Sequence, residues 1–379
     1  MKKIKQINKN VYLLGIVSLL TDISSELIFS VFSVFYTVIL GASTALLGLV
    51  EGLADFSASS LDYISGYFSD KTGKRKIFAL WGYGFSTVAK CLLLFSTVFS
   101  ASLFRIVERL GKSFRSPPRD AWLSSFTTKK NRGFSFGIHK TLDKIGAIIG
   151  PLIAYGVLSY FGETKKVFFW LFLFAIIPAI ASIIMLMVIK ETPIKPIKKQ
   201  TFFQSTYSKK FKQYLWSAGI FSLAYFSFGF LLLKAYTIGF AIKDVVLLYA
   251  LFNVSFVLVA APIGKIADKV SKKIIISTSY VLYTLMAIGF IFAKTKLSVI
   301  LLFVLYGVFY AIDASQTRAY IVDLEKKRAT AIGLYNYITG IIYLPASIIA
   351  GILWKYNPSY AFGFAAIISL IALIVFVKK

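Results

Sequence analysis

Gly66-Tyr-Phe-Ser-Asp70-Lys-Thr-Gly73-Lys-Arg-Lys76 lies between two apolar runs, and a second stretch of similar design occurs in the other half of the chain. This second stretch is Gly264-Lys-Ile-Ala-Asp268-Lys-Val-Ser-Lys-Lys273. In each stretch a glycine that permits close helix packing precedes an aspartate by four residues, and basic residues follow. The two aspartates are 198 residues apart, about half of the 379-residue chain. The sequence therefore predicts a duplicated membrane protein with equivalent loops in its two halves.

The composition excludes an ordinary soluble domain. Hydrophobic residues make up 58% of the chain and the mean hydropathy is +0.75, so lipid must be the solvent for much of the surface. The apolar runs have the length of membrane helices, about 20 residues, rather than the short alternation of an outer-membrane barrel. We expect twelve spans, near residues 11–38, 43–66, 77–98, 100–122, 134–160, 167–189, 213–240, 245–264, 274–293, 297–320, 330–354 and 359–377.

The net charge of +27 comes from basic residues that gather in alternate loops. Lysine and arginine favour the cytoplasmic side of a membrane protein, so this asymmetry places both termini in the cytoplasm and requires an even number of spans. We therefore expect a multi-pass protein of the cell (cytoplasmic or inner) membrane. Its large partner would be the lipid bilayer and not nucleic acid, and we expect a monomer. Cys91 is the only cysteine, which excludes an intramolecular disulfide.

A further repeat and a polar segment divide the chain into halves. Gly146-Ala-Ile-Ile-Gly150-Pro151 is matched by Gly340-Ile-Ile-Tyr-Leu-Pro345, about half a chain later. The basic, proline-containing segment 190–212 predicts a cytoplasmic linker. We expect an N-terminal six-helix bundle over 1–189 and a C-terminal six-helix bundle over 213–379, with a transport pathway between them.

The first two spans carry acids that lipid would not tolerate. Asp22 and Glu26 lie on one face of the first span, and Glu51 and Asp55 lie near one face of the second. Since a charged side chain at the bilayer centre costs roughly 2.5–3.5 kcal/mol, these acids must face the bundle interior. Crowded carboxylates can take up and release protons near neutral pH, which makes Asp22 and Glu26 candidate proton carriers. The alternative is that they are permanently ionised partners of nearby cations.

Basic residues of the third and fourth spans would compensate these acids. Lys90 lies deep in an apolar run, and Arg105, Arg109 and Lys112 follow the helical i, i+4, i+7 spacing. This basic stripe either neutralises the acids of the first two spans or lines the pathway and holds an anionic group. We expect Arg105 to line the pathway and the cytoplasmic end of the stripe to be structural.

The second half of the chain has few acids, so we expect it to determine substrate choice rather than energy coupling. Candidate substrate-binding residues come from both halves: Glu51, Asp55, Lys90, Lys234, Asn253, Asp313 and Gln316. The cations of Lys90, Arg105 and Lys234 favour an anionic or zwitterionic substrate.

Several of these stretches resemble motifs of the major facilitator superfamily. The loops at 66–76 and 264–273 resemble its signature between the second and third helices, repeated between the eighth and ninth. Residues 105–113 resemble its fourth-helix arginine motif, in which the arginine takes part in proton transfer. Residues 146–151 resemble the fifth-helix motif typical of its proton antiporters, in which small residues permit close packing and proline bends the helix.

The resemblance implies an all-α membrane protein with twelve transmembrane helices in two pseudo-symmetric six-helix bundles. It also implies a secondary active transporter that moves a small solute by alternating access, with proton antiport and efflux as the expected mode and with no cofactor. Proton coupling would be carried by Asp22, Glu26, Arg105 and Arg109. Gating would be carried by Gly66, Asp70, Arg75, Gly264, Asp268, Gly146, Gly150 and Pro151.

Three alternatives stay open. The same scaffold could run proton-coupled uptake as a symporter. The carboxylates of Asp22, Glu26, Glu51 and Asp55 could instead ligate a divalent metal cation as cargo, although the nearby arginines and lysines oppose this. A membrane enzyme would depend on the nucleophile-elbow pattern Gly133-Phe-Ser-Phe-Gly137, but that pattern requires a strand and a sharp turn, whereas here it opens a membrane helix.

Overall fold

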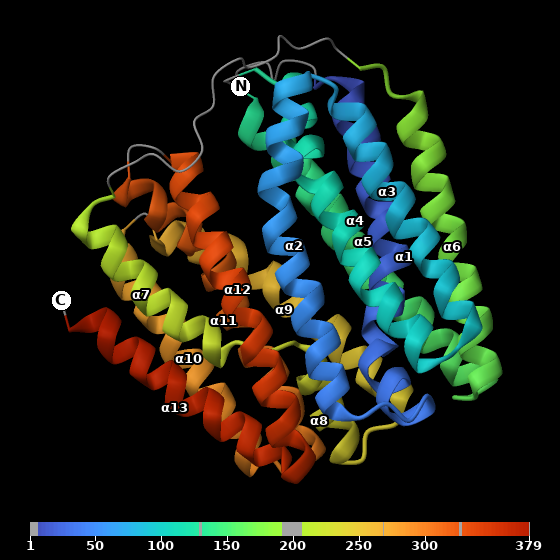
Figure 1. The fold of residues 1–379 in the computed structure, drawn as a ribbon, viewed down its shortest axis with the longest axis vertical. Helices are drawn as coiled ribbons and strands as arrows, with labels where there is room; N and C mark the ends of the chain where they lie inside the picture. Colours follow the sequence, from blue (N-terminus) through green and yellow to red (C-terminus); the bar gives the residue numbers. More distant parts are fainter. Residues whose placement is uncertain (1–6, 129–130, 192–206, 268, 326–327, 379) are drawn as a thin grey trace. The chain divides into compact units, whose positions relative to one another are not determined.

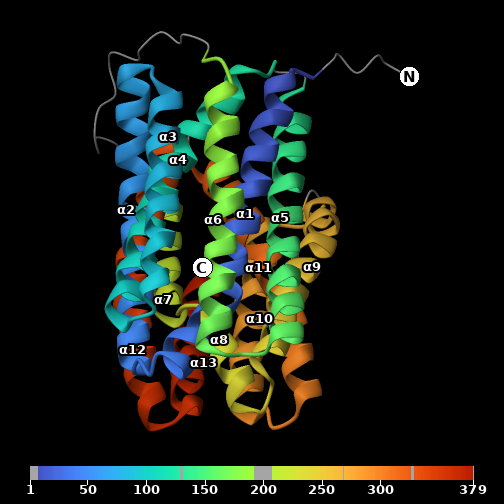
Figure 2. The same ribbon diagram turned by 90° about the vertical axis from the view of Figure 1, so that its right-hand side faces the viewer.

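The computed structural model describes residues 7–128, 131–191, 207–267, 269–325 and 328–378, and every regular element in these ranges is a helix (Figures 1 and 2). The elements are α1 (Lys9–Val34), η1 (Phe35–Ile39), α2 (Thr44–Thr72), α3 (Arg75–Cys91), η2 (Leu92–Phe95), α4 (Val98–Ser125), α5 (Arg132–Phe161), α6 (Lys165–Val188), α7 (Lys209–Ala224), α8 (Gly229–Thr237), α9 (Ile242–Ala267), α10 (Lys272–Phe292), α11 (Lys296–Leu324), α12 (Arg328–Tyr356) and α13 (Pro358–Val377).

These helices form the predicted twelve membrane spans. Ten segments are long and apolar enough to cross a bilayer, with α1 and η1, α3 and η2, and α7 and α8 each counting as one segment. The other two spans are α2 and α4, whose charged residues lower their hydropathy. The two spans that look least like membrane helices therefore carry several intramembrane charges, which must face protein rather than lipid.

One predicted span is interrupted. The run 213–240 was expected to be one helix, but α7 ends at Ala224 and α8 begins at Gly229. The freed backbone has polar partners: the Tyr283 hydroxyl donates a hydrogen bond to the Ala224 carbonyl (2.7 Å), and the Gly229 amide donates one to the Ser227 hydroxyl (3.2 Å). Broken helices occur inside membranes where protein satisfies the exposed backbone groups, and transporters often bind their cargo at such breaks.

The described residues form two compact units. One contains those among Met1–Val31 and Leu61–Gln200, and the other contains those among Phe32–Ser60 and Thr201–Lys379. The first unit therefore holds most of α1, the last part of α2 and all of α3 to α6. The second holds α7 to α13 with the end of the α1 span and the first part of α2. The domain boundaries expected at 189 and 213 stay a prediction, since most of the linker lies outside the described residues.

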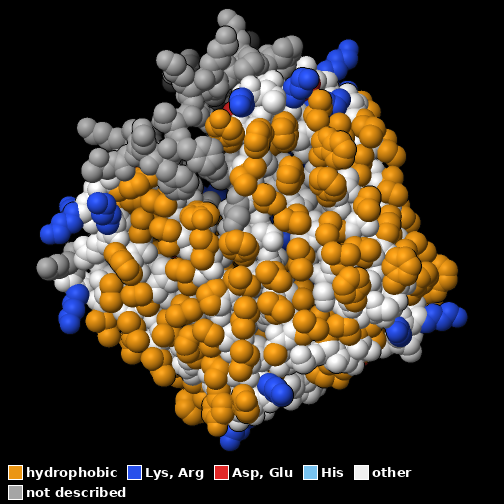
Figure 3. Space-filling model, viewed as in Figure 1, with side chains coloured by type: hydrophobic (Ala, Val, Ile, Leu, Met, Phe, Trp, Pro, Cys, Tyr) orange, Lys and Arg blue, Asp and Glu red, His pale blue; other side chains and the backbone are white. Residues whose placement is uncertain are grey.

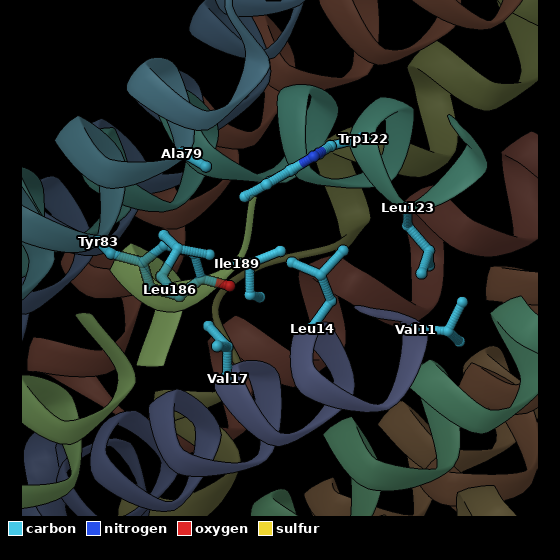
Figure 4. Close-up of a cluster of buried hydrophobic side chains, with 9 residues drawn as sticks. All are labelled: Val11, Leu14, Val17, Ala79, Tyr83, Trp122, Leu123, Leu186 and Ile189. Atoms are coloured by element: carbon cyan, nitrogen blue, oxygen red, sulfur yellow. The ribbon is translucent and has the colours of Figure 1, made fainter. Parts of the chain in front are cut away.

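A hydrophobic cluster packs one end of the first unit (Figure 4). It joins the beginnings of α1 and α3 to the ends of α4 and α6. Its buried members are Val11, Leu14, Val17, Ala79, Tyr83, Trp122, Leu123, Leu186 and Ile189. Because these side chains come from four helices, they hold α1, α3 and α4 at a constant spacing where the polar residues of the next turns begin.

Aromatic rings and small residues pack the second unit. Phe221 of α7 stacks on Tyr280 of α10 with ring centroids 4.1 Å apart. Along α2 and α12 the backbones approach closely: a Cβ atom at Gly351 would lie 2.5 Å from the Thr44 carbonyl oxygen, and one at Gly48 would collide with the Ser347 carbonyl. The start of α2 is therefore held tightly against the end of α12.

The outer surface is apolar. Hydrophobic side chains cover most of the face drawn in Figure 3, and lysine and arginine side chains lie mainly at its margins. Large apolar residues are exposed on several helices, including Phe99, Trp216 and Leu258, which are 79%, 74% and 68% exposed. A surface of this kind is stable only against lipid.

Candidate functional site

The two acids of α1 face a cation of α4. Asp22 and Glu26 are half-buried in the first unit, and the Lys112 ammonium interacts electrostatically with both. Phe29, one turn further along α1, lies under the guanidinium groups of Arg105 and Arg109, 4.4 and 5.8 Å from its ring centroid. A ring face attracts a cation, so these contacts place both arginines against α1, close to Glu26. The four residues predicted to couple protons thus lie on facing helices of one unit.

Lys90 is fully buried where α3 meets α1. Its ammonium donates hydrogen bonds to the hydroxyl groups of Ser24 (2.5 Å) and Ser25 (3.2 Å). The Ser24 hydroxyl in turn donates to the Ala175 carbonyl of α6 (2.5 Å). Lys90 was predicted to bind substrate, and the structure shows it holding three helices of the first unit through neutral oxygen atoms.

A buried ion pair within α4 lies where this helix packs against α3. Arg115 and Glu108 are 3% and 0% exposed, and their charged groups are 3.8 Å apart. Arg115 also donates a hydrogen bond to the Ser86 hydroxyl, and its guanidinium lies 5.0 Å from the centroid of the Tyr83 ring. Arg115, which follows the predicted basic stripe by three residues, therefore has structural partners, whereas the roles of Arg105, Arg109 and Lys112 stay predictions.

The predicted small-residue motif of α5 packs against α1. A Cβ atom at Gly146 would lie 2.5 Å from the Leu19 carbonyl oxygen, and one at Gly150 would lie 2.6 Å from the Ile23 carbonyl oxygen. Only glycine allows the two backbones to come this close. Pro151 lies inside α5, directly after this contact. The motif therefore joins α5 to the helix that carries Asp22.

We expect Gly150→Val to destabilise the protein, because its side chain would overlap the backbone of α1 at Ile23 and Leu27. Overpacking of this kind costs about 1–3 kcal/mol or more. The matched control is Gly156→Val on the same helix, where a Cβ atom would meet nothing within 4 Å. Size-exclusion chromatography after graded heating in detergent would measure both variants. Equal loss of the monodisperse peak in the two variants would contradict the close α1–α5 contact.

The loop between α2 and α3 links three helices of the first unit. Arg75 forms an ion pair with Asp70 (3.3 Å) and donates a hydrogen bond to the Ala121 carbonyl of α4 (2.6 Å). A Cβ atom at Gly66 would lie 3.4 Å from Pro117, so α2 and α4 are in contact there. In the second copy of the motif, a Cβ atom at Gly264 would meet nothing within 4 Å, and Asp268 lies outside the described residues. The gating roles of these residues stay predictions.

The remaining candidate substrate residues lie in the second unit. Glu51 is buried, and the Ser227 hydroxyl at the break between α7 and α8 donates a hydrogen bond to it (2.9 Å). Asp313 of α11 accepts a hydrogen bond from Thr317 (3.3 Å). The other four are half-buried or buried: Asp55, Lys234, Asn253 and Gln316. Of the seven candidates, only Lys90 belongs to the first unit.

Sequence reasoning missed three features of these surroundings. No feature of the sequence identified Ser227 as a partner of Glu51. Tyr214 was not singled out, yet it donates a hydrogen bond to Thr317 (3.4 Å), which itself donates to Asp313. Asp143 was not among the predicted site residues. An acid inside the expected span 134–160 was the signal that could have identified it.

The structure supplies no metal-binding group among its described residues: no cluster of three or more histidine, cysteine, aspartate or glutamate side chains there could hold an ion. The four carboxylates considered for a metal cargo are also divided between the units, since Asp22 and Glu26 belong to the first and Glu51 and Asp55 to the second.

Solved structures with the same fold are transporters. The nucleoside transporter NupG (D323A mutant) superposes with a TM-score of 0.79 over 97% of this chain and 99% of its own, at 14% identity. The D-xylose-proton symporter gives a TM-score of 0.74 over 97% and 96% of the two chains, at 12% identity. At these identities the likeness establishes the fold alone.

The sequence comparisons establish the family. The Major Facilitator Superfamily profile matches residues 14–246 and 215–379. The MFS-type transporter MJ1317 of Methanocaldococcus jannaschii is 36% identical to this chain, over 97% of it and 94% of the relative. The multidrug resistance protein MdtH of Aeromonas hydrophila is 25% identical over 39% of the chain and 38% of its own length. With its twelve membrane spans and its intramembrane charges, this chain belongs to the major facilitator superfamily and moves a small solute across a membrane by alternating access.

Proposed function

We propose that the protein is a proton-coupled antiporter of the cell membrane that exports a small anionic or zwitterionic solute, with both termini in the cytoplasm. The observation that carries the proposal is the cluster of charged side chains inside the first unit. Asp22 and Glu26 of α1 interact with Lys112 of α4, and Arg105 and Arg109 of α4 lie over the ring of Phe29, three residues after Glu26. Ionisable groups buried in membrane helices are costly, and they are retained where protons or ions move.

Proton coupling follows from the charges in this cluster. Protonation of Asp22 or Glu26 removes a negative charge and weakens its attraction to the cations of α4. The contact between α1 and α4 then changes in strength with proton occupancy, which is what a transporter needs to link a proton to a change of access. Among the buried, described residues of the first unit, Lys90, Arg105 and Arg115 outnumber the carboxylates of Glu108 and Asp143. This excess of cations supports an anionic or zwitterionic substrate.

Substrate-induced proton movement in proteoliposomes tests the proposal. Purified protein would be reconstituted with a pH-sensitive dye in the lumen, with potassium and valinomycin to clamp the membrane potential and with no initial pH gradient. Small carboxylates, zwitterionic amino acids, nucleosides, peptides and D-xylose would then be added outside, one at a time. Liposomes without protein provide the background.

We expect at least one anionic or zwitterionic compound to make the lumen alkaline, because an antiporter releases protons as the solute enters, whichever way the protein is inserted. Acidification of the lumen by the same compound would identify a symporter and overturn the antiport assignment. A response limited to nucleosides or D-xylose would contradict the proposed substrate class.

A further inference from the structure

Asp143 of α5 is a buried carboxylate that accepts hydrogen bonds at both oxygen atoms. It is 8% exposed. The Ser18 hydroxyl of α1 donates to Oδ1 (2.6 Å), and the Lys140 ammonium lies 2.5 Å from Oδ2. Arg119 of α4 donates a hydrogen bond to the same Ser18 hydroxyl (3.2 Å). Side chains of α1, α4 and α5 therefore meet at this carboxylate.

The carboxyl groups of Asp22 and Asp143 lie close enough to repel each other electrostatically. Two ionised carboxylates have only acceptor oxygens, so a direct hydrogen bond between them needs a proton. One proton shared by the pair supplies that donor and removes the repulsion of two like charges held together away from water. Their proximity therefore favours a pair that holds one proton.

The backbone keeps the two carboxyl groups together. Gly146 follows Asp143 by three residues, and a Cβ atom there would lie 3.0 Å from the Cβ atom of Asp22. On α1, Ser18 precedes Asp22 by four residues, so both side chains face α5. The small-residue contact between the helices thus brings the Asp22 side chain close to the turn of α5 that carries Asp143.

We propose that Asp143 is the second half of the proton-binding site, and that Asp22 and Asp143 bind one proton jointly between α1 and α5. The proposal rests on the proton coupling proposed above and names the pair that would perform it. When the pair releases its proton to water, its charge changes from −1 to −2. The two helices then repel each other at the point where their backbones are closest, which favours a different packing of α1 against α5.

Charged and titratable groups face the pair from each neighbouring helix. They are Glu26 on α1, Lys90 on α3, Lys112, Arg119 and Asp120 on α4, and His139, Lys140 and Lys144 on α5. The cations in this set stabilise the doubly ionised pair and so permit the proton to leave. His139 is 3% exposed, and among the described residues its Nε2 atom has no hydrogen-bond partner, which leaves it able to accept a hydrogen bond from a water molecule beside Asp143.

Infrared difference spectroscopy of the protein in lipid would test the shared proton without any substrate. The carbonyl stretch of a protonated carboxylic acid is separated from that of a carboxylate, and subtraction of variant from wild type cancels every other carboxyl group. At neutral pH we expect the same carboxylic acid band to be lost in Asp22→Asn and in Asp143→Asn. Glu26→Gln is the control and should retain the band.

Retention of the band in Asp143→Asn, with loss in Asp22→Asn, would overturn the proposal because Asp22 would hold the proton alone. Absence of any difference band for both variants would overturn it too. Ser18→Ala is a small change that keeps both carboxyl groups, so it tests the assignment even if the aspartate variants do not fold. It should shift the frequency of the band, because it removes a hydrogen bond to Asp143, and an unchanged frequency would contradict the assignment. These spectra need no transport, so a protein that shows the band but no substrate-induced proton movement would refute the antiport function and leave the shared proton standing.

Discussion

Asp22→Asn is expected to abolish substrate-induced proton movement in proteoliposomes, reducing the signal to that of liposomes without protein. Asparagine has nearly the shape of aspartic acid but cannot release a proton, so the charge that faces Lys112 no longer changes. The dye assay with the compound that gives the largest wild-type response would measure this. Solute exchange across the membrane, which requires no net proton movement, should persist.

Glu26→Gln is the companion variant for this experiment, since Glu26 lies on the same face of α1 and also interacts with Lys112. Loss of proton movement only in Asp22→Asn assigns the coupling to Asp22. If both variants keep wild-type proton movement, neither acid carries the proton, and the coupling role of α1 is wrong.

Arg115→Ala is expected to lower the free energy of unfolding by about 3–5 kcal/mol, the range measured when one partner of a buried ion pair is removed. Glu108 is 0% exposed and would keep its charge without the guanidinium that faces it. The Ser86 hydroxyl would also lose a donor. Equilibrium unfolding in a denaturing detergent, followed by intrinsic fluorescence, would measure the change.

The double variant Arg115→Met with Glu108→Gln separates lost charge balance from lost packing. Replacing both partners of a buried pair by groups of similar volume often costs little, so we expect the double variant to recover most of the stability. If Arg115→Ala unfolds as the wild type does, or if the double variant is less stable than Arg115→Ala, the buried ion pair of α4 does not stabilise the protein.

The membrane helices and the family could be predicted from the sequence because both depend on local patterns. An apolar run of about 20 residues is a span wherever it occurs, and the loops at Asp70 and Asp268 recur at a spacing of half the chain. The cost of a charge in lipid likewise required Asp22 and Glu51 to face protein before any helix was positioned. Even the close α5 contact could be anticipated from Gly146 and Gly150, whose small size serves helix packing in any membrane protein.

The partners of these residues could not be predicted, because a hydropathy pattern holds no information on the rotation and height of one helix relative to another. The substrate role expected for Lys90 stays a prediction, but its hydrogen-bond partners Ser24 and Ser25, more than 60 residues earlier on another helix, could not be foreseen. The α7–α8 break at Ser227 escaped prediction for the same reason, since Tyr283 and Glu51 reach it from other helices.

The sequence by itself therefore determined which segments span the membrane and which charges must avoid lipid, because these follow from the free energy of transfer of each residue. Only the tertiary structure decided which charges meet. Asp143 stands next to Asp22 because Gly146 permits two backbones to approach across the bundle, and that approach depends on the register of α1 against α5. Register is settled by the simultaneous packing of side chains from several helices, a property that no single stretch of the chain contains.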